Sequence, residues 1–417
     1  MPDADRAAAV APIVVGIGTY NNAGTIAAIA RAVRDGLCRD FSVRDSRIVL
    51  ADGGSTDGTP DLVREALGDA AGRLVQVGYP LHPVDLFDAP YHGLPGRGRA
   101  LAAILGAARE LGAQVCTVLD ANAEGLAPGW LAALIRPVLD DAFDFVAPYY
   151  ARAPHEGALT RSIVYPVFRA LYGVRIRQPM AGDFSCSGRL VEHFLGQEGW
   201  QDGARAVGVD IWTTTAAVCG GFRLCEVALG ARRHETRGDA PDLSMTIVQV
   251  VGALFAGAER RAEFWQRVRG SSAVPVFGQP TEAGDGSPIE IGRLIEAFRL
   301  GHRELRDVWA AVLPPATGVA LNRLAQADRP SFAMDDDLWA RIIYDFAIGH
   351  RLRVLPADHL LRALTPLYLG WLAAFLEQAG TAGAAAVEER IERLSLAFER
   401  QKPYLISRWR WPERFNA

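Results

Sequence analysis

Lysine is almost missing from this chain of 417 residues, because Lys402 is the only one among 44 basic residues. A phosphate-binding loop that ends in Gly-Lys-Ser/Thr is therefore excluded, and a Schiff-base lysine is not expected. The net charge is −4. Nucleic-acid binders usually carry a concentrated basic excess, so nucleic acid is not an expected partner.

Cysteines are few and form no recognisable set. The chain has five of them, an odd number, and no two are spaced Cys-x-x-Cys. We therefore expect neither a disulfide framework nor a structural zinc site. We interpret the cysteines as small buried side chains of a protein in a reducing compartment.

Long hydrophobic runs are also lacking. The N-terminal segment MPDADRAAAV carries two aspartates and no apolar core of a signal peptide. The most apolar later stretch, 363–376, is shorter than the about 20 residues that cross a bilayer. We expect a soluble, cytoplasmic protein with no membrane partner.

Short apolar runs alternate with helical patterns over the first 150 residues. Strands are predicted at 13–18, 48–51, 74–77, 115–119 and 143–146, and helices at 23–37, 60–67, 101–111 and 130–139. This alternation predicts βαβ units and a mostly parallel, Rossmann-like sheet. Ligands of such sheets bind at the carboxyl ends of the strands, so the polar residues that follow each strand are the candidates.

The pattern changes along the second half of the chain. Helices are predicted at 159–171, 209–219, 243–255, 291–313, 339–348, 359–378 and 384–400, a strand at 222–229, and loops at 178–183 and 270–288. We therefore predict an α/β domain over 1–240 and a mainly helical domain over 241–417. The helical domain is a candidate surface for forming a homo-oligomer.

Three strand ends carry polar motifs: Thr-Tyr-Asn-Asn at 19–22, Ala-Asp-Gly-Gly-Ser-Thr-Asp-Gly-Thr at 51–59, and Leu-Asp-Ala-Asn at 119–122. Carboxylates accept hydrogen bonds from ribose hydroxyls, and glycines let the backbone approach a ligand. The spacing of Asp120 and Asn122 suits a divalent cation on a diphosphate, although the amide brings no charge. The alternative is that Asp57, Thr59 and Asp120 are helix caps.

Taken in this order, the three motifs resemble those of nucleotide-sugar glycosyltransferases of the GT-A fold, in the broad family 2-like group. Later segments follow in the order found in mannosylglycerate synthase and its relatives, the glucosylglycerate and glucosyl-3-phosphoglycerate synthases. They read APYYARAPHEGALT at 147–160, QPMAGD at 178–183, VGVD at 207–210 and ARRH at 231–234. The resemblance covers most of the chain.

The resemblance implies a donor site and a metal site. The implied donor-binding residues are Thr19, Tyr20, Asp52, Arg97, Arg99 and Asp120. Arg97 or Arg99 stands where the relatives place a lysine near the diphosphate, and arginine can bind phosphate bidentately. The implied ligands of Mg²⁺ or Mn²⁺ are Asp120, Asn122 and His234.

The same resemblance implies an acceptor site and two catalytic carboxylates. Arg152, Glu156 and Thr160 match acceptor-binding positions, and Asp183 and Asp210 match acidic residues that line the donor sugar and the acceptor. If the enzyme is retaining, Asp210 positions groups and the leaving phosphate takes the acceptor's proton.

Each of these assignments has a structural alternative. His234 could lie in a solvated polar turn, Arg152 could pair with Glu156 one helical turn on, and Asp210 could cap a helix. Three further arginines are predicted to form a solvated face, with binding of an acceptor phosphate as the alternative: Arg169, Arg175 and Arg177.

The resulting hypothesis is a retaining, metal-dependent hexosyltransferase. It would transfer glucose or mannose from UDP-glucose, GDP-glucose or GDP-mannose to D-glycerate or 3-phosphoglycerate, giving a charged compatible solute or its precursor. The alternatives are an inverting family 2-like transferase with a lipid or polysaccharide acceptor, and a degenerate nucleotide-sugar binder without catalytic activity.

The acceptor assignment predicts the effect of replacing Arg152 with alanine. The variant should raise the KM for the acceptor far more than the KM for the donor, because the guanidinium would bind the acceptor's carboxylate. Steady-state kinetics with both substrates varied would test this, and equal effects on the two KM values would contradict it.

Overall fold

The structure is a computed structural model. It describes residues 12–41, 45–87, 93–124, 127, 129–151, 157–197, 208–231, 233–234, 242–279, 289–379 and 384–412. These residues form two compact units. The sheet unit takes its residues from Met1–Ala151, Gln178–Ala240 and Val274–Ala283, and the helical unit from Arg152–Arg177, Pro241–Ala273 and Gly284–Ala417.

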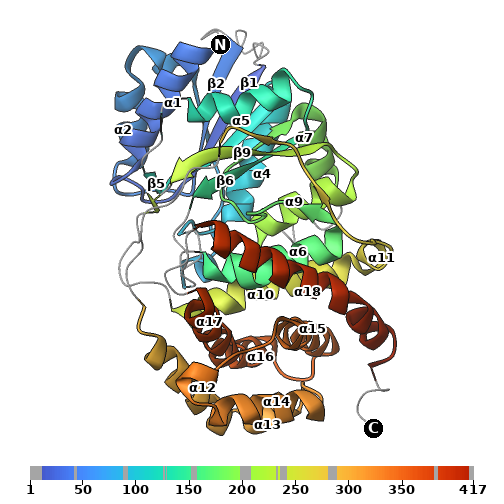
Figure 1. Ribbon diagram of the computed structural model, residues 1–417. Coiled ribbons are helices and arrows are strands. Elements are labelled where there is room, and N and C mark those ends of the chain that lie inside the picture. The colour runs from blue at the N-terminus through green and yellow to red at the C-terminus, as the bar shows by residue number, and fades with distance from the viewer. Residues whose placement is uncertain are drawn as a thin grey trace. The chain divides into compact units, whose positions relative to one another are not determined.

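An eight-stranded sheet forms the centre of the sheet unit, in the order β12-β9-β6-β8-β4-β1-β2-β3 (Figure 1). The strands are β1 (Ile13–Thr19), β2 (Ser46–Asp52), β3 (Leu74–Gly78), β4 (Val115–Asp120), β6 (Phe145–Ala151), β8 (Phe184–Ser187), β9 (Leu224–Ala231) and β12 (Val276–Phe277). Strand β8 runs antiparallel to both of its neighbours, and the other paired strands are parallel. The prediction of a mostly parallel sheet followed by a mainly helical region is confirmed.

Helices cover both faces of this sheet. They are α1 (Ile26–Asp40), α2 (Thr59–Leu67), α3 (Pro83–Phe87), α4 (Arg97–Glu110), α5 (Trp130–Leu139), α7 (Gly188–Gly196) and α9 (Val209–Cys219), with the 3-10 helix η2 (Gly68–Arg73). A small second sheet pairs β5 (Ala123–Glu124) with β10 (Arg233–His234). Helix α7 directly follows β8, and the Ser187 hydroxyl caps it by accepting from Leu190 N–H.

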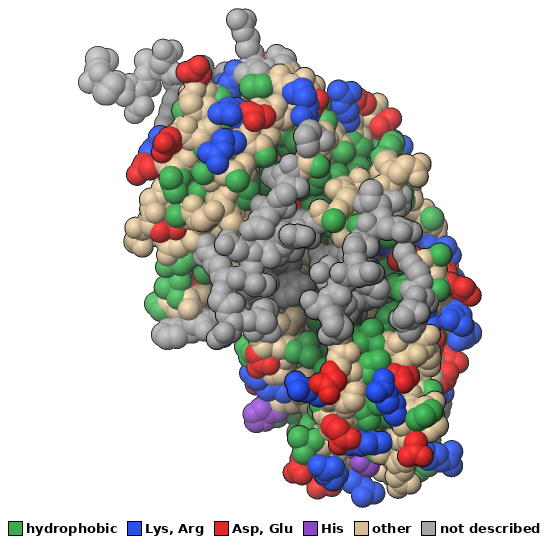
Figure 2. Space-filling view, turned by 60° about the vertical axis from the view of Figure 1, so that its left-hand side comes forward, with side chains coloured by type: hydrophobic (Ala, Val, Ile, Leu, Met, Phe, Trp, Pro, Cys, Tyr) green, Lys and Arg blue, Asp and Glu red, His purple; other side chains and the backbone are tan. Residues whose placement is uncertain are grey.

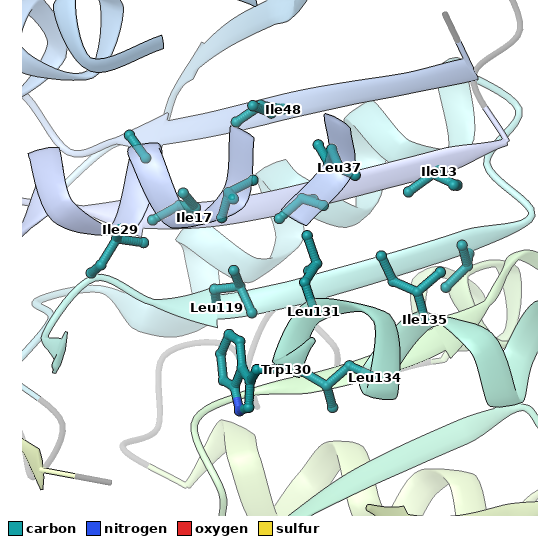
Figure 3. Close-up of a cluster of buried hydrophobic side chains, with 14 of the residues drawn as sticks. Ile13, Ile17, Ile29, Leu37, Ile48, Leu119, Trp130, Leu131, Leu134 and Ile135 are labelled. Atoms are coloured by element: carbon teal, nitrogen blue, oxygen red, sulfur yellow. The ribbon is translucent and has the colours of Figure 1, made fainter. Parts of the chain in front are cut away.

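The main core of the sheet unit lies between the sheet and helices α1, α2 and α5. Figure 3 shows Ile13 and Ile17 of β1 pointing toward side chains of α1 and α5, among them Ile29 and Leu131. Because side chains alternate along a strand, the residues between them face the other side of the sheet. Apolar residues on both faces make β1 a fully buried strand, as its continuous apolar run indicates.

On the other face, helix α4 packs directly on the backbone of β1. A Cβ atom on Gly16 would lie 2.2 Å from Ile104 Cγ2, and one on Gly18 would lie 3.1 Å from Ala100 Cβ, both on α4. The two glycines therefore allow α4 to approach the strand closely. This approach fixes the N-terminus of α4, where Arg97 begins the helix.

The helical unit contains most of the C-terminal half of the chain. Its elements are the π-helix η3 (Thr160–Val164), α6 (Tyr165–Tyr172), β7 (Val174–Arg175), α10 (Leu243–Arg260), α11 (Ala262–Trp265), β11 (Ser272–Ala273), α12 (Ile291–Glu304), α13 (Arg306–Ala310), α14 (Pro315–Gln326), η4 (Arg329–Ser331), α15 (Asp336–Leu352), α16 (Ala357–Ala363), α17 (Thr365–Ala379) and α18 (Ala384–Arg410). Helix α18 packs on α6 and α15. Buried rings of Trp339, Trp371 and Phe375 stack at centroid distances of 5.9 and 5.1 Å.

Arg169 corrects the prediction of a solvated arginine face. Its side chain is fully buried and pairs with Glu392 at 2.5 Å and Glu399 at 2.7 Å, both on α18. Arg177 pairs with Glu388 of the same helix. Arg169 and Arg177 thus hold α18 in place, because a buried guanidinium requires compensating carboxylates. Arg175 donates to Ser271 Oγ at 3.0 Å.

The structure divides two of the predicted helices at positions where the hydrophobic pattern of the sequence continues. The predicted helix 291–313 is broken between α12 and α13 at Leu305, and 359–378 is broken between α16 and α17 at Leu364. The predicted loop 270–288 contains β11 and β12. Strand β8 and helices α7 and α14 were not predicted.

One apolar stretch is long enough by length and composition to cross a membrane. It comprises the 22 residues Ala357–Gln378 and is therefore longer than the apolar run 363–376 within it. Within the described residues, 67% of the most apolar window is buried. Core helices of soluble proteins pass the same test.

Surface charges of both signs intermingle on the face that Figure 2 shows. Among the described residues, exposed ion pairs within a helical turn include Arg64 with Asp61 and Arg299 with Glu296. Exposed pairs of this kind contribute at most about 1 kcal/mol each. A mixed surface gives little long-range attraction for a polyanion.

The close packing of α4 on β1 predicts the effect of one added methyl group. Gly16→Ala should lower the free energy of unfolding by about 1–3 kcal/mol, because its Cβ would overlap Ile104. Gly106→Ala on α4 is the matched control, since its Cβ meets nothing within 4 Å. Urea unfolding should show the control unchanged or stabilised, and equal stability of the two variants would contradict the packing argument.

Candidate active site

Strand register brings three of the predicted motifs to one edge of the sheet. Thr19 at the end of β1 pairs with Asp52 at the end of β2. On the other side of β1, Gly18 pairs with Asp120, the last residue of β4. The polar residues that follow these strands therefore gather at the carboxyl ends of β1, β2 and β4, where doubly wound sheets bind ligands.

Asp52 organises the loop that follows β2. Its Oδ1 accepts from Thr19 Oγ1 at 2.8 Å and from Ser55 Oγ at 2.6 Å. Its Oδ2 accepts from the backbone N–H groups of Gly54 at 3.0 Å and Ser55 at 2.8 Å. A carboxylate has about four acceptor positions, so a nucleoside hydroxyl would have to replace one of these donors.

Asn22 joins the first motif to the third. Its Nδ2 donates to Asn122 Oδ1 at 2.9 Å, and its Oδ1 accepts from Tyr20 N–H at 2.8 Å. Its own N–H donates to Thr59 Oγ1 at 2.8 Å, at the start of α2. This buried asparagine therefore fixes the orientation of the Asn122 amide.

Asp183 binds the backbone of Asp120 at the end of β4. The carboxylate of Asp183 is fully buried. It accepts from Asp120 N–H at 2.8 Å and from Tyr150 Oη at 2.6 Å. Asp120 in turn accepts at its Oδ1 from Asn122 N–H at 2.9 Å. The structure thus brings Asp183 and Asp120 together, and Asp183 holds the end of β4 in place.

Arg97 supplies positive charge beside Asp120. Its Nε donates to Asp210 Oδ1 at 3.1 Å, and its Nη2 donates to Gly182 O at 2.6 Å. Burial acts to lower the pKa of Arg97, but the nearby carboxylates of Asp210 and Asp120 outweigh it and raise that pKa. Arg97 therefore stays charged, and its remaining N–H groups are available to an anion.

Arg99, the alternative to Arg97, lies two residues further along α4 and has other partners. Its Nε donates to Pro80 O at 2.6 Å, and its guanidinium pairs with Asp85 of α3. Of the two arginines, Arg97 is thus the one beside Asp120 and Asp210.

Gly182 keeps a space open between Arg97 and Asp120. A Cβ atom on this glycine would lie 3.0 Å from Arg97 Nη2 and 3.2 Å from Asp120 Oδ2. The backbone of Gly182 does not have a positive φ angle, so its conformation does not require glycine. Because Gly182 has no side chain, the place that its Cβ atom would take is left open beside the Arg97 guanidinium and the Asp120 carboxylate.

The side-chain oxygen atoms of Asp120 and Asn122 are of the kind that a hard divalent cation binds. Mg²⁺ and Mn²⁺ prefer carboxylate, carbonyl and amide oxygens. Asp120 provides a carboxylate, and Asn122 provides an amide oxygen. His234 pairs through its backbone with Ala123, next to Asn122, in the sheet of β5 and β10. The described residues include no group of three His, Cys, Asp or Glu side chains that could hold a metal.

The predicted acceptor residues are placed only in part. Arg152 and Glu156 lie outside the described residues. Thr160 begins the π-helix η3 of the helical unit. Their role toward an acceptor stays a prediction.

Four residues of the site were not singled out from the sequence: Asn22, Tyr79, Tyr150 and Gly182. Tyr79 directly follows β3, so the rule that polar residues after strands are candidates would have found it. Asn22, Tyr150 and Gly182 stand inside the quoted motifs, but their hydrogen bonds or close contacts link residues that are far apart in the chain.

Comparisons with known proteins give no assigned family: no family model and no curated protein matches the chain. Among solved structures, it is similar to glucosyl-3-phosphoglycerate synthase from Mycobacterium tuberculosis in complex with Mg²⁺ and UDP, at 21% identity and a TM-score of 0.43, covering 59% of this chain and 79% of that one. The chain is also similar to the complex of the same synthase with Mn²⁺, UDP-glucose and phosphoglyceric acid. The identity is 20% and the TM-score 0.41, and the match covers 59% of this chain and 79% of that one. A likeness of this size does not extend those ligands to this chain.

The space over Gly182 predicts the effect of a single methyl group. Gly182→Ala should weaken binding of a nucleoside diphosphate with Mg²⁺ by roughly ten- to hundredfold, because the methyl group would occupy the position between Arg97 and Asp120. Calorimetry would measure this. Gly196→Ala at the end of α7, where a Cβ meets nothing within 4 Å, is the control. Unchanged affinity in Gly182→Ala would contradict the prediction.

Proposed function

We propose that the chain is a nucleotide-sugar glycosyltransferase that transfers a hexose from a nucleoside diphosphate sugar to a small carboxylate acceptor. The observation behind the proposal is that Arg97 Nη2 and Asp120 Oδ2 both approach the position that a Cβ atom on Gly182 would take. A guanidinium suits the negative charge of a diphosphate, and a carboxylate suits the cation that accompanies it. The order of the sequence motifs supports the same donor.

Arg97 would bind the departing diphosphate. It already donates to Asp210 and Gly182, so its orientation is fixed before a ligand arrives. A preorganised charge stabilises a leaving group without the cost of reorienting solvent during the reaction. Asp120 and Asn122, with His234, would hold Mg²⁺ or Mn²⁺, which supplies further neutralisation of the diphosphate.

The surroundings of the two catalytic candidates support a retaining reaction. Asp210 is engaged by Arg97, and Asp183 is engaged by Asp120 N–H and the Tyr150 hydroxyl. Neither is more than 2% exposed. An inverting transferase needs a carboxylate free to accept the acceptor's proton. In a retaining reaction the sugar–phosphate bond breaks, the bond to the acceptor oxygen forms, and the leaving phosphate takes the proton.

We propose D-glycerate or 3-phosphoglycerate as the acceptor, and glucose or mannose as the transferred sugar. Arg152 would bind the acceptor's carboxylate, and Glu156 and Thr160 its hydroxyl groups. The product would be a charged compatible solute such as glucosylglycerate or mannosylglycerate, or a phosphorylated precursor.

Asn122 favours a second candidate, a nucleotide-sugar binder without catalytic activity. Its amide brings no charge to the metal position, and its Oδ1 already accepts from Asn22. Under this candidate, Asn122→Asp should create metal-dependent turnover that the natural chain lacks. Turnover by the natural chain would eliminate it.

A matrix of transfer assays tests the proposed function. UDP-glucose, GDP-glucose and GDP-mannose would be crossed with D-glycerate and 3-phosphoglycerate, each with Mg²⁺, Mn²⁺ or EDTA. We expect transfer with one donor and one acceptor, abolished by EDTA, with the anomeric configuration of the donor retained by NMR. The absence of transfer in every combination would contradict the proposed activity.

Two arginine variants in the same assay test the donor geometry. Arg97→Gln should lower kcat/KM by roughly a hundredfold, because it removes a charge-assisted contact with the leaving group. Arg99→Gln should have a smaller effect, because the partners of Arg99 are Pro80 and Asp85. A larger loss in Arg99→Gln would transfer the diphosphate role to that residue.

A further inference from the structure

The side chain of Tyr79 connects three segments of the candidate donor site. Its hydroxyl lies 3.1 Å from Thr19 O at the end of β1 and 3.1 Å from Pro95 O just before α4. Its backbone N–H donates to Asp52 O at the end of β2, at 3.2 Å. Tyr79 is 5% exposed, so these contacts form away from solvent.

Two glycines make room for the Tyr79 ring. A Cβ atom on Gly53 would lie 2.8 Å from the Cζ and Oη atoms of Tyr79, and one on Gly96 would lie 3.2 Å from its Cε2. Gly96 has a φ angle of 62° and caps the N-terminus of α4, where Arg97 is the next residue. The ring is thus enclosed by the turn that follows β2 and the turn that presents Arg97.

The hydroxyl has a function that the ring alone cannot supply. Thr19 O already accepts from Gly53 N–H at 2.9 Å, whereas Pro95 O needs a donor where water is excluded. The Tyr79 O–H has one proton, lies 3.1 Å from Pro95 O and can supply that donor. Burial, followed by the charge of Asp52, raises the pKa of Tyr79 well above its usual value, so the hydroxyl keeps its proton at neutral pH.

We propose that Tyr79 is a positioning residue that sets the guanidinium of Arg97 against the leaving diphosphate, through the Pro95–Gly96 turn. The proposal rests on the proposed function. Tyr79 touches neither Arg97's hydrogen-bond partners nor the metal position in any contact described above. It acts by fixing the turn from which Arg97 extends.

Tyr79→Phe tests the proposal, because it removes the hydroxyl and keeps the ring. The affinity for UDP or GDP, measured with Mg²⁺ by calorimetry, should fall about three- to tenfold. The affinity for uridine or guanosine should stay within about twofold, because a nucleoside has no phosphate for Arg97 to bind. Equal losses for nucleotide and nucleoside would show a general structural defect and overturn the proposal.

A double-mutant cycle with Arg97→Gln supplies a second criterion. If Tyr79 acts through Arg97, adding Tyr79→Phe to Arg97→Gln should cause no further loss of diphosphate affinity beyond about twofold. Independent, additive losses would overturn the proposal. Tyr344→Phe is the matched control, since Tyr344 is also buried and donates to a backbone carbonyl, Phe398 O, in the helical unit.

The nuclear magnetic resonance signal of the Arg97 Nε–H group separates failure of this proposal from failure of the proposed function. The signal is identified by its absence in Arg97→Gln and needs no ligand. Tyr79→Phe should shift or broaden it, and Tyr344→Phe should not. Absence of UDP and GDP binding by the natural protein would contradict the proposed function alone, whereas an unchanged Arg97 signal in Tyr79→Phe would overturn the role of Tyr79.

Discussion

The buried ion pair between Arg97 and Asp210 is the interaction on which the geometry of the candidate site depends. A guanidinium that is removed from water needs charge and hydrogen-bond partners, and Asp210 of α9 and the carbonyl of Gly182 provide them. The pair therefore fixes the start of α4, the start of α9 and the segment before β8 relative to one another. Asp120 lies within the electrostatic reach of the same guanidinium, so one buried charge organises both the anion and the cation sides of the site.

The sequence predicts the sheet well where the hydrophobic pattern is local and repeated. The strand ends that carry Thr19, Asp52 and Asp120 follow from alternating apolar runs, and helices 130–139 and 209–219 match α5 and α9 in both bounds. Strand β8 could not be predicted, because four residues, Phe-Ser-Cys-Ser, contain no distinctive period. Its place between β4 and β6 depends on pairing with residues about 40 to 70 positions away.

The site was predicted as a set of residue types, but the sequence does not reveal which lone pairs are already in use. Asp52 and Asp183 were selected as acidic residues that bind a ligand, and the structure shows both accepting hydrogen bonds from the protein itself. The position of Tyr79 directly after β3 is visible in the sequence, but its contacts with Thr19 and Pro95 are not. The importance of Gly182 likewise comes from contacts across the fold. A glycine matters here for the atoms it lacks, which no motif records.

A crystal structure of the protein with Mn²⁺ and the donor nucleotide that it binds most tightly, UDP or GDP, tests the central claim most directly. The account predicts that the diphosphate lies over Gly182, with an oxygen atom in hydrogen-bond contact with Arg97, and that the anomalous signal of Mn²⁺ lies beside the carboxylate of Asp120. A diphosphate bound away from Gly182, with Arg97 contacting only Asp210 and the Gly182 carbonyl, would contradict it.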